Sequence, residues 1–571
     1  MIRRISIGLC LLLYVLKIQS AEQIMVWITF VDKNNTSYSL NRPHEFLSQR
    51  AIERRQHQMI PLDANDLPVS TSYLETLLSN PSIELYYTSR WFNGALVGLT
   101  EEGLLEEINT YEFVQETELV KPSLEKDIKT KQKTGHSLML DSRSQDTVLS
   151  HSVKMVAPFP YSISSYWNTH PNYGLAQNQV ELVNGQILHK LGYRGNGKVI
   201  AVLDSGFSNV DSLEAFQHLW HKGKILGTKD FVNPGTSVFR EHFHGTYVLS
   251  VMAGFIYDEF AGAALDASYL LLRTEDASSE FRIEEYNWLA GAEYADSAGA
   301  DIINSSLGYT VFDYEPQNYT YAHMDGNSTI VARAANKANS RGLLVVNSAG
   351  NYGNQNWRYV GSPADAHGVL AVGGTDDSGV RVGFSSVGPT SDGRIKPDVM
   401  AKARAVASVN PSGGISNANG TSFSAPLISA LAACLWQRFP DASNDKIKNA
   451  IIQSGDRFLS PDSLYGNGIP DFQKAYDILN VADRRDSFVS LGINPVKAES
   501  SLIFHAEKEQ RISIELINSS GQRIWYLTDI PVQIGYNELK PFRQIEDLTS
   551  GVYLIKMNFK NHTELIKALK L

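Results

Sequence analysis

The pattern of apolar and polar residues changes along the chain, and the changes divide it into units. Between Met25 and Val120, alternating runs predict strands, and runs with a period near 3.6 predict helices. The expected strands cover 26–31, 83–88, 95–99 and 113–119, and the expected helices cover 70–79 and 101–109. A polar helix at about 45–58 interrupts this order. Without it the order is βαββαβ, which predicts a compact α+β unit.

The middle of the chain, from Gly195 to about Asn480, alternates apolar runs with helical patterns. The runs predict buried strands at 199–204, 269–273, 301–305 and 343–350, and the helices are expected near 245–254, 283–298 and 329–340. Such alternation predicts an α/β domain whose parallel sheet is covered by helices on both faces. Its functional crevice is expected at the carboxyl ends of the strands.

Two further segments have patterns of their own. Residues 121–165 are rich in lysine and serine and lack a sustained period, so we expect an exposed, cleavable linker. Residues 487–571 contain short alternating strands separated by glycine turns, which predicts a small β-sandwich domain.

The first 21 residues have the features of an export signal. Arg3 and Arg4 precede an apolar run, Ile5 to Leu16, which is short for a membrane span. We therefore predict a cleaved signal peptide, with a membrane anchor as the alternative. The expected units are a signal peptide at 1–21, an N-terminal domain at 22–120, a linker at 121–165, an α/β domain at 166–482 and a β domain at 487–571.

Composition narrows the possible partners and the compartment. The 571 residues carry a net charge of -10 without a large basic block, which argues against nucleic acid as a partner. Without the signal, Cys434 is the only cysteine, so no intramolecular disulfide can form. An exported chain of this size without disulfides is typical of a bacterial route.

The segment N-G-T-S-F-S-A-P, residues 419–426, places Ser422 at the start of a predicted helix behind a glycine. A serine there can present its hydroxyl while the first helical N–H groups remain free to polarise a carbonyl. The alternative is a helix N-cap serine followed by an early proline.

Two other residues could serve such a serine. Asp204 closes a predicted strand and is followed by Ser205-Gly206, and His244 precedes Gly245-Thr246 at the start of a helix. Taken singly, D-S-G is a common turn and the histidine is a capping residue. Two alternatives remain open. His242 and His244 could form a metal pair, and the second D-S-G, at Asp377, could pair with Asp204 as in a bilobal aspartic protease.

In the order Asp204, His244, Ser422, and with S-A-G-N at 348–351, these motifs resemble the subtilisin-like serine proteases. The resemblance covers about 195–455. It implies the acid, base and nucleophile in that order, and Asn351 as a side-chain donor to the oxyanion. It also implies a set of substrate-binding residues: Ser306, Leu307, Gly308, Ser348, Gly350 and Gly361. Gly361, at the base of the primary specificity pocket, suggests that a sizeable apolar side chain enters there.

The flanking units extend the resemblance. The βαββαβ order resembles the propeptides of this family, with an independent binding domain as the alternative. Asn494-Pro495, Gly521, Gly535, 550–556 and Lys567 resemble the C-terminal sorting domain of the Bacteroidetes type IX secretion system, with an ordinary binding module as the alternative.

We therefore predict a serine endopeptidase made as a zymogen, exported through the periplasm to the medium or cell surface. Its expected partners are polypeptide substrates, its own propeptide and the outer-membrane secretion machinery, and we expect a monomer. No cofactor is expected to be required, and the resemblance allows structural calcium at unlocated sites. The alternative function is a catalytically silent surface protein that binds peptides.

Overall fold

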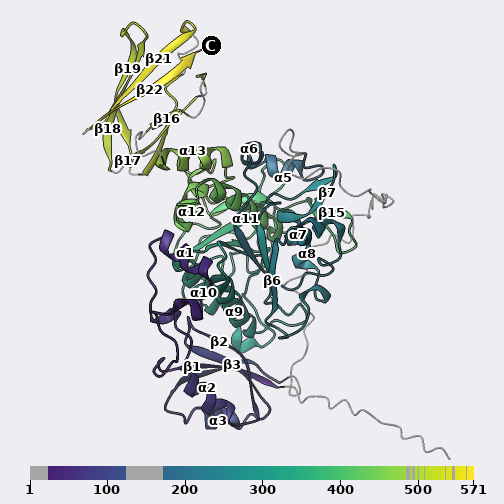
Figure 1. Cartoon of the computed structure of the whole chain (residues 1–571). Coiled ribbons are helices and arrows are strands. Elements are labelled where there is room, and N and C mark those ends of the chain that lie inside the picture. Colours follow the sequence, from purple (N-terminus) through teal and green to yellow (C-terminus); the bar gives the residue numbers. More distant parts are fainter. Residues whose placement is uncertain are drawn as a thin grey trace, which may run out of the picture.

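The computed structural model describes residues 23–123, 172–483 and 489–570, apart from 492–494, 499, 507, 534, 543–546 and 561. Three parts follow one another in space (Figure 1): a small N-terminal α+β unit, a large central domain, and a β domain beyond helix α13 at the opposite end. The expected signal peptide, and the linker except its first three residues, lie outside the described residues. In the described part of the chain, no helix is long and apolar enough to cross a membrane.

The central domain is built on a seven-stranded sheet whose order is β13-β12-β11-β10-β5-β9-β6, and all the neighbouring strands are parallel. The strands are β5 (Val199–Asp204), β6 (Ile225–Asp230), β9 (Ser268–Arg273), β10 (Ile302–Ser305), β11 (Leu344–Ser348), β12 (Val369–Thr375) and β13 (Val399–Lys402). Short strands β7 (Phe255–Ile256) and β8 (Phe260–Ala261), and β14 (Val406–Val409) and β15 (Ile415–Ala418), form two hairpins beside it. The predicted parallel α/β sheet is confirmed.

Helices cover both faces of this sheet and create two apolar cores. On β5, Ile200 and Val202 face one core, which contains α8 (His244–Ala253) and α11 (Thr421–Arg438). Ala201 and Leu203 face the other core, with α9 (Ile283–Ala298) and α10 (Ile330–Ser340). This alternation follows from the period of two in a strand, and it explains why a strand buried on both faces contains a continuous apolar run. The remaining helices of the domain are α5 (Gln177–Glu181), α6 (Gln186–Lys190), α7 (Gln217–His221), α12 (Asn444–Gln453) and α13 (Phe472–Asp483).

The N-terminal unit contains a four-stranded antiparallel sheet, β2-β3-β1-β4. Its elements are β1 (Ile24–Phe30), α1 (Gln49–His57), α2 (Thr71–Leu78), β2 (Ile83–Ser89), β3 (Gly94–Leu99), α3 (Leu104–Ile108) and β4 (Val114–Lys121). Apart from the inserted α1, this is the predicted βαββαβ order. Its sheet lies against α9 of the central domain (Figure 1), and Trp27 of β1 stacks on Tyr286 of α9 with ring centroids 4.3 Å apart.

The C-terminal domain consists of two antiparallel sheets, β16-β17-β20 and β19-β18-β21-β22, around one apolar core. Its strands are β16 (Val489–Leu491), β17 (Leu502–Ala506), β18 (Gln510–Asn518), β19 (Arg523–Val532), β20 (Gly535–Leu539), β21 (Gly551–Asn558) and β22 (Thr563–Lys570). The predicted all-β domain is confirmed. Asn494, one residue of the sorting-domain resemblance, lies outside the described residues.

Candidate active site

Asp204 and His244 meet at the carboxyl edge of the central sheet. Asp204 is the last residue of β5, and its side chain is completely buried. Its Oδ1 accepts hydrogen bonds from the backbone N–H of Ser205 at 2.8 Å and from Nδ1 of His244, the first residue of α8, also at 2.8 Å. The carboxylate therefore fixes which ring nitrogen of His244 carries a proton and leaves Nε2 to face the other way.

The charge of Asp204 also controls the basicity of the imidazole. Burial by itself lowers the pKa of His244, but the attraction and hydrogen bond of Asp204, helped by Glu275, outweigh it and raise the pKa above its ordinary value of 6.5. The imidazole becomes a stronger base than a buried histidine would otherwise be, which suits a group that accepts a proton and later returns it.

Ser422 lies at the start of α11, on the same edge of the sheet. The N-cap of this helix is Gly420, whose φ of 146° is a conformation that other residues rarely adopt, and Ser422 is the second helical residue. The N-cap interpretation of Ser422 is therefore wrong. At the second position the backbone N–H has no intrahelical acceptor, so the helix offers an N–H donor beside the hydroxyl.

Pro426 leaves the backbone carbonyl of Ser422 free to accept a hydrogen bond from the segment after β10. Four residues after Ser422 a helix normally donates an N–H to its carbonyl, but proline has no N–H. That carbonyl instead accepts the hydroxyl of Ser306, the residue after β10, at 2.9 Å. The hydroxyl of Ser422 in turn donates to the Ser306 carbonyl at 3.5 Å. Within the described residues no hydrogen bond joins Ser422 to His244, although the His244 ring lies beside α11, 6.0 Å from the Phe423 ring.

Asn351 follows β11 and faces the start of α11. Its Oδ1 accepts the backbone N–H of Thr421 at 2.9 Å and the Thr421 hydroxyl at 3.1 Å. The Thr421 hydroxyl also accepts the N–H of Gly350 at 3.2 Å. With its oxygen held, Asn351 directs its NH₂ group away from Thr421 and leaves it available as a donor. The sequence pattern alone assigns no role to Thr421, although this residue lies inside the N-G-T-S motif.

The predicted substrate-binding residues form two segments that flank Ser422. Ser306, Leu307 and Gly308 follow β10, and Ser348, Gly350 and Asn351 end or follow the adjacent β11. The carbonyl of Leu307 accepts the side-chain N–H of Asn347 at 2.9 Å, which ties the segments together. Gly361 lies near the first segment, because the next residue, Ser362, forms an antiparallel bridge with Tyr309, which directly follows Gly308.

The positions of the residues argue against both alternatives, the pair of aspartic-protease carboxylates and the pair of metal-binding histidines. Asp377 is exposed in a turn after β12, whereas Asp204 is fully buried, so the two carboxylates have no common environment in which to share a proton. His242 binds the hydroxyl of Ser205 through Nδ1 at 3.0 Å, and Nδ1 of His244 binds Asp204. In the part of the chain that the structure describes, no further histidine, cysteine or acidic residue completes a metal site with this pair.

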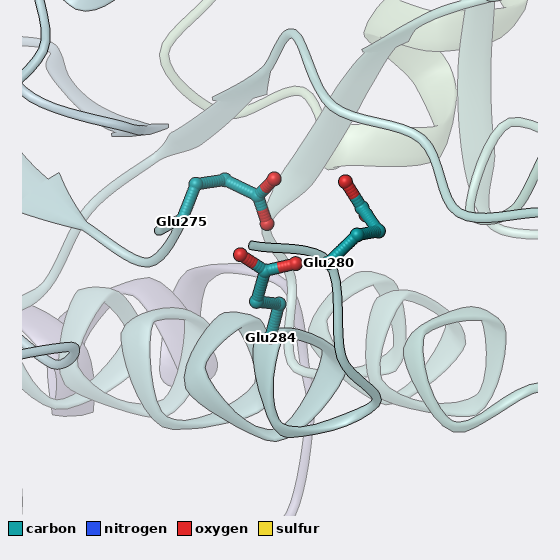
Figure 2. Close-up of side chains that lie close together, drawn as sticks. All are labelled: Glu275, Glu280 and Glu284. Atoms are coloured by element: carbon teal, nitrogen blue, oxygen red, sulfur yellow. The ribbon is translucent and has the colours of Figure 1, made fainter. Parts of the chain in front are cut away.

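Three buried glutamates lie close together near the site. Figure 2 shows the carboxyl groups of Glu275, Glu280 and Glu284 gathered above helix α9, and their ligand atoms lie within 4.8 Å of one another. The Tyr309 hydroxyl donates to Glu275 at 2.5 Å, and the N–H of Asp276 donates to Glu284 at 2.8 Å. Carboxylate oxygens are ligands that calcium accepts, but none of these three residues is without a partner in the protein. The calcium expectation stays a prediction.

The N-terminal unit is bound to helix α9 by two buried carboxylates. Glu293 accepts the backbone N–H groups of Arg90 at 3.0 Å and Trp91 at 3.2 Å. Asp296 lies one helical turn further and forms ion pairs with Arg54, Arg55 and Arg90 of the N-terminal unit. Burial alone would raise the pKa of Asp296, but these arginines outweigh it and lower the pKa below its ordinary value.

Two arginines of α1 also bind the carbonyl groups at the C-terminal end of α9. Arg54 donates to the carbonyl of Ala300, just past the end of that helix, and Arg50 donates to the carbonyl of Gly299 at 2.7 Å. Cations are favourable at a helix C-terminus, where the last carbonyls lack intrahelical partners. The inserted helix α1 is therefore a second attachment of the N-terminal unit, in addition to its sheet.

Comparison with known proteins identifies two parts of the chain. Residues 195–468 match a model described as the subtilase family, and residues 25–136 match the Peptidase S8 propeptide domain of Bacteroidota. The chain is 30% identical over 291 residues to a thermostable alkaline protease of Halalkalibacterium halodurans, covering 51% of this chain and 70% of that protein. It is 29% identical over 307 residues to subtilisin NAT of Bacillus subtilis subsp. natto, covering 53% and 70%. Among solved structures, MycP1 from Mycobacterium smegmatis is 25% identical, with a TM-score of 0.42 and coverage of 54% and 86%.

Proposed function

Because this chain belongs to the subtilase family of serine peptidases and is made with a propeptide, we propose that it hydrolyses peptide bonds of extracellular proteins through Asp204, His244 and Ser422. One observation carries the proposal. Buried Asp204 holds Nδ1 of His244 at the same edge of the sheet where the start of α11 presents Ser422.

The proposed reaction assigns each group one task. A serine hydroxyl is a weak nucleophile at neutral pH, so His244 accepts its proton while the oxygen of Ser422 bonds to the peptide carbonyl carbon. The carbonyl oxygen becomes negative, and the NH₂ of Asn351 and the N–H of Ser422 donate to it. Losing one such donor costs about 3 kcal/mol, a value measured in subtilisin itself. His244 then protonates the leaving amine, and water hydrolyses the acyl-enzyme by the same steps in reverse.

A serine-directed reagent tests the assignment on the native protein. We expect phenylmethanesulfonyl fluoride to inactivate the processed enzyme and to modify Ser422, since this serine lies at the helix start beside the proposed base and oxyanion donors. Peptide mass spectrometry locates the modification, and residual casein hydrolysis measures the inactivation. Pepstatin, which is directed at paired carboxylates, is the control and is expected to have no effect. Modification of another serine, or inhibition by pepstatin, would contradict the assignment.

We propose that the propeptide remains bound after it has been cleaved, and that the arginines around Asp296 hold it in place. Replacement of Asp296 by asparagine removes the ion-pair partner of Arg54 and Arg90, and it leaves Arg55 paired with Asp66 alone. Removing one partner of a buried ion pair typically costs about 3–5 kcal/mol, so we expect propeptide binding to weaken about a hundredfold or more. Size-exclusion chromatography of the processed protein measures how much propeptide co-elutes.

The matched control for this change is Asp211→Asn, which removes an exposed pair with Arg240 and touches no residue of the propeptide. The control is expected to retain the propeptide as the wild type does, because exposed pairs contribute about 0–1 kcal/mol. Equal retention by the Asp296→Asn protein would show that the ion pairs of Asp296 are not needed to hold the propeptide.

The remaining expectations complete the proposal. Export is supported by the basic and apolar pattern of residues 1–21, and attachment or release through type IX secretion by the features of residues 487–571. The unit boundaries, the absence of a required cofactor, the absence of a nucleic-acid partner and the monomeric state remain predictions.

A further inference from the structure

Tyr352 links the two segments that flank Ser422. It directly follows Asn351, at the end of the segment after β11. Its hydroxyl donates to the carbonyl of Gly308, in the segment after β10, at 3.4 Å. The phenol therefore connects one segment with the other, and only 7% of the residue is exposed.

The ring also lies close to two glycines, Gly350 and Gly361, beside Ser386 and Thr310. A Cβ at Gly350 would lie 3.1 Å from Cδ2 and 3.2 Å from Cε2 of Tyr352, and a Cβ at Gly361 would lie 3.5 Å from Cε2. These separations mean that the ring is packed directly against both glycines. Gly350 has a φ of 100°, so a larger residue there would be strained as well as crowded.

Both ends of Tyr352 are held in place. Its backbone N–H donates to the hydroxyl of Ser386 at 3.0 Å, and its phenol reaches Gly308. Burial raises the pKa of the phenol well above 10, so the hydroxyl stays a neutral donor at the pH of any peptidase assay. A side chain fixed at both ends and packed on two glycines is part of the pocket rather than a movable rim.

We propose that Tyr352 fills the primary specificity pocket and restricts the enzyme to substrates with a small residue, glycine, alanine or serine, on the N-terminal side of the scissile bond. The inference rests on the proposed function, because that side chain must enter beside Ser422, between Ser306–Gly308 and Ser348–Asn351. A phenylalanine or leucine would have to displace the ring and break its contact with Gly308. This proposal differs from the expectation drawn from Gly361, because the Tyr352 ring would contact a Cβ at that position at 3.5 Å.

Two matched peptide substrates, which differ only in alanine or phenylalanine before the scissile bond, test the proposal with the full processed enzyme. Pocket discrimination of this kind reaches about 10–200-fold. We expect the wild type to favour the alanine peptide about a hundredfold in kcat/KM. The Tyr352→Ala variant is expected to cleave the phenylalanine peptide about a hundredfold faster than the wild type does. Tyr352→Phe, which keeps the ring, is expected to retain the wild-type ratio.

Each result has a separate meaning. Equal cleavage of both peptides by the wild type, or an unchanged ratio in Tyr352→Ala, overturns the pocket proposal while leaving the serine peptidase intact. Absence of cleavage of either peptide by the wild type, together with no modification of Ser422 by the sulfonyl fluoride, overturns the proposed function and the pocket with it. If Tyr352→Ala does not fold, the cleavage sites that the wild type selects in a mixed peptide library decide the question. Large residues before those sites would overturn the proposal.

Discussion

Replacement of Ser422 by alanine is expected to leave the chain unprocessed and unable to hydrolyse casein. Without the hydroxyl no acyl-enzyme can form, and His244 has no proton to accept. The expected loss of kcat is about 10⁶-fold, the effect of removing the nucleophilic serine of subtilisin, with about 10³–10⁴-fold acceleration over water left from binding and oxyanion donors. Gel electrophoresis of the purified protein measures processing, and casein hydrolysis measures turnover.

The matched control is Ser424→Ala, on the same helix. Its hydroxyl donates to the Thr421 carbonyl at 2.8 Å and has no place in the proposed reaction. This variant is expected to process itself. If the Ser422→Ala protein and the wild type were equally active, Ser422 would not be the nucleophile. If both were inactive, the silent peptide-binding alternative would be favoured.

Replacement of Asp204 by asparagine is expected to reduce kcat by about 10⁴-fold at neutral pH with little change in KM. An amide at this position stabilises the wrong tautomer of His244, an effect of about this size in a serine protease of unrelated fold. The variant also changes the pH profile. Asp204 raises the pKa of His244 above 6.5, and activity needs the neutral imidazole, so wild-type kcat/KM rises as the pH increases through that pKa. Without the carboxylate, burial dominates and the acidic limb moves to lower pH.

The control for this change is Asp377→Asn, in the second D-S-G of the chain. Its carboxylate is exposed, and we expect neither kcat nor the pH profile to change. A large loss in the Asp377 variant would revive the paired-carboxylate alternative. An acidic limb that stayed in place in the Asp204 variant would mean that another group controls the titration.

Burial explains which elements the sequence predicted. Strands β5, β9, β10 and β11 lie inside the sheet between two cores, so each contains a continuous apolar run that stands out in the sequence. The edge strand β6 was not predicted, because most of its side chains are exposed or half-buried and its pattern has no apolar run. In β12, Gly373 and Gly374 resemble a turn signal, but they allow Met400 and Ala403 to pack closely.

The candidate site also contains residues that the sequence identifies and contacts that it does not. Asp204, His244, Ser422 and Asn351 lie in short motifs whose residue types are required by the chemistry, so sequence alone singled them out. Other contacts depend on residues far apart in the chain, such as the bond from Ser306 to the Ser422 carbonyl that Pro426 leaves free. No local pattern encodes such a contact, because its partners are brought together only by the packing of β10 against α11.

By itself, the sequence determined the α+β N-terminal unit, the parallel α/β domain and the all-β C-terminal domain, and it predicted the residues of the proposed reaction. Periodicity and motif chemistry are local properties, and they can be read without a fold. The tertiary structure decided that Ser422 is not a helix cap, that three arginines of the propeptide surround Asp296, and that Tyr352 occupies the space beside Gly361. These features depend on which distant side chains share a buried volume, and only the packed chain determines that.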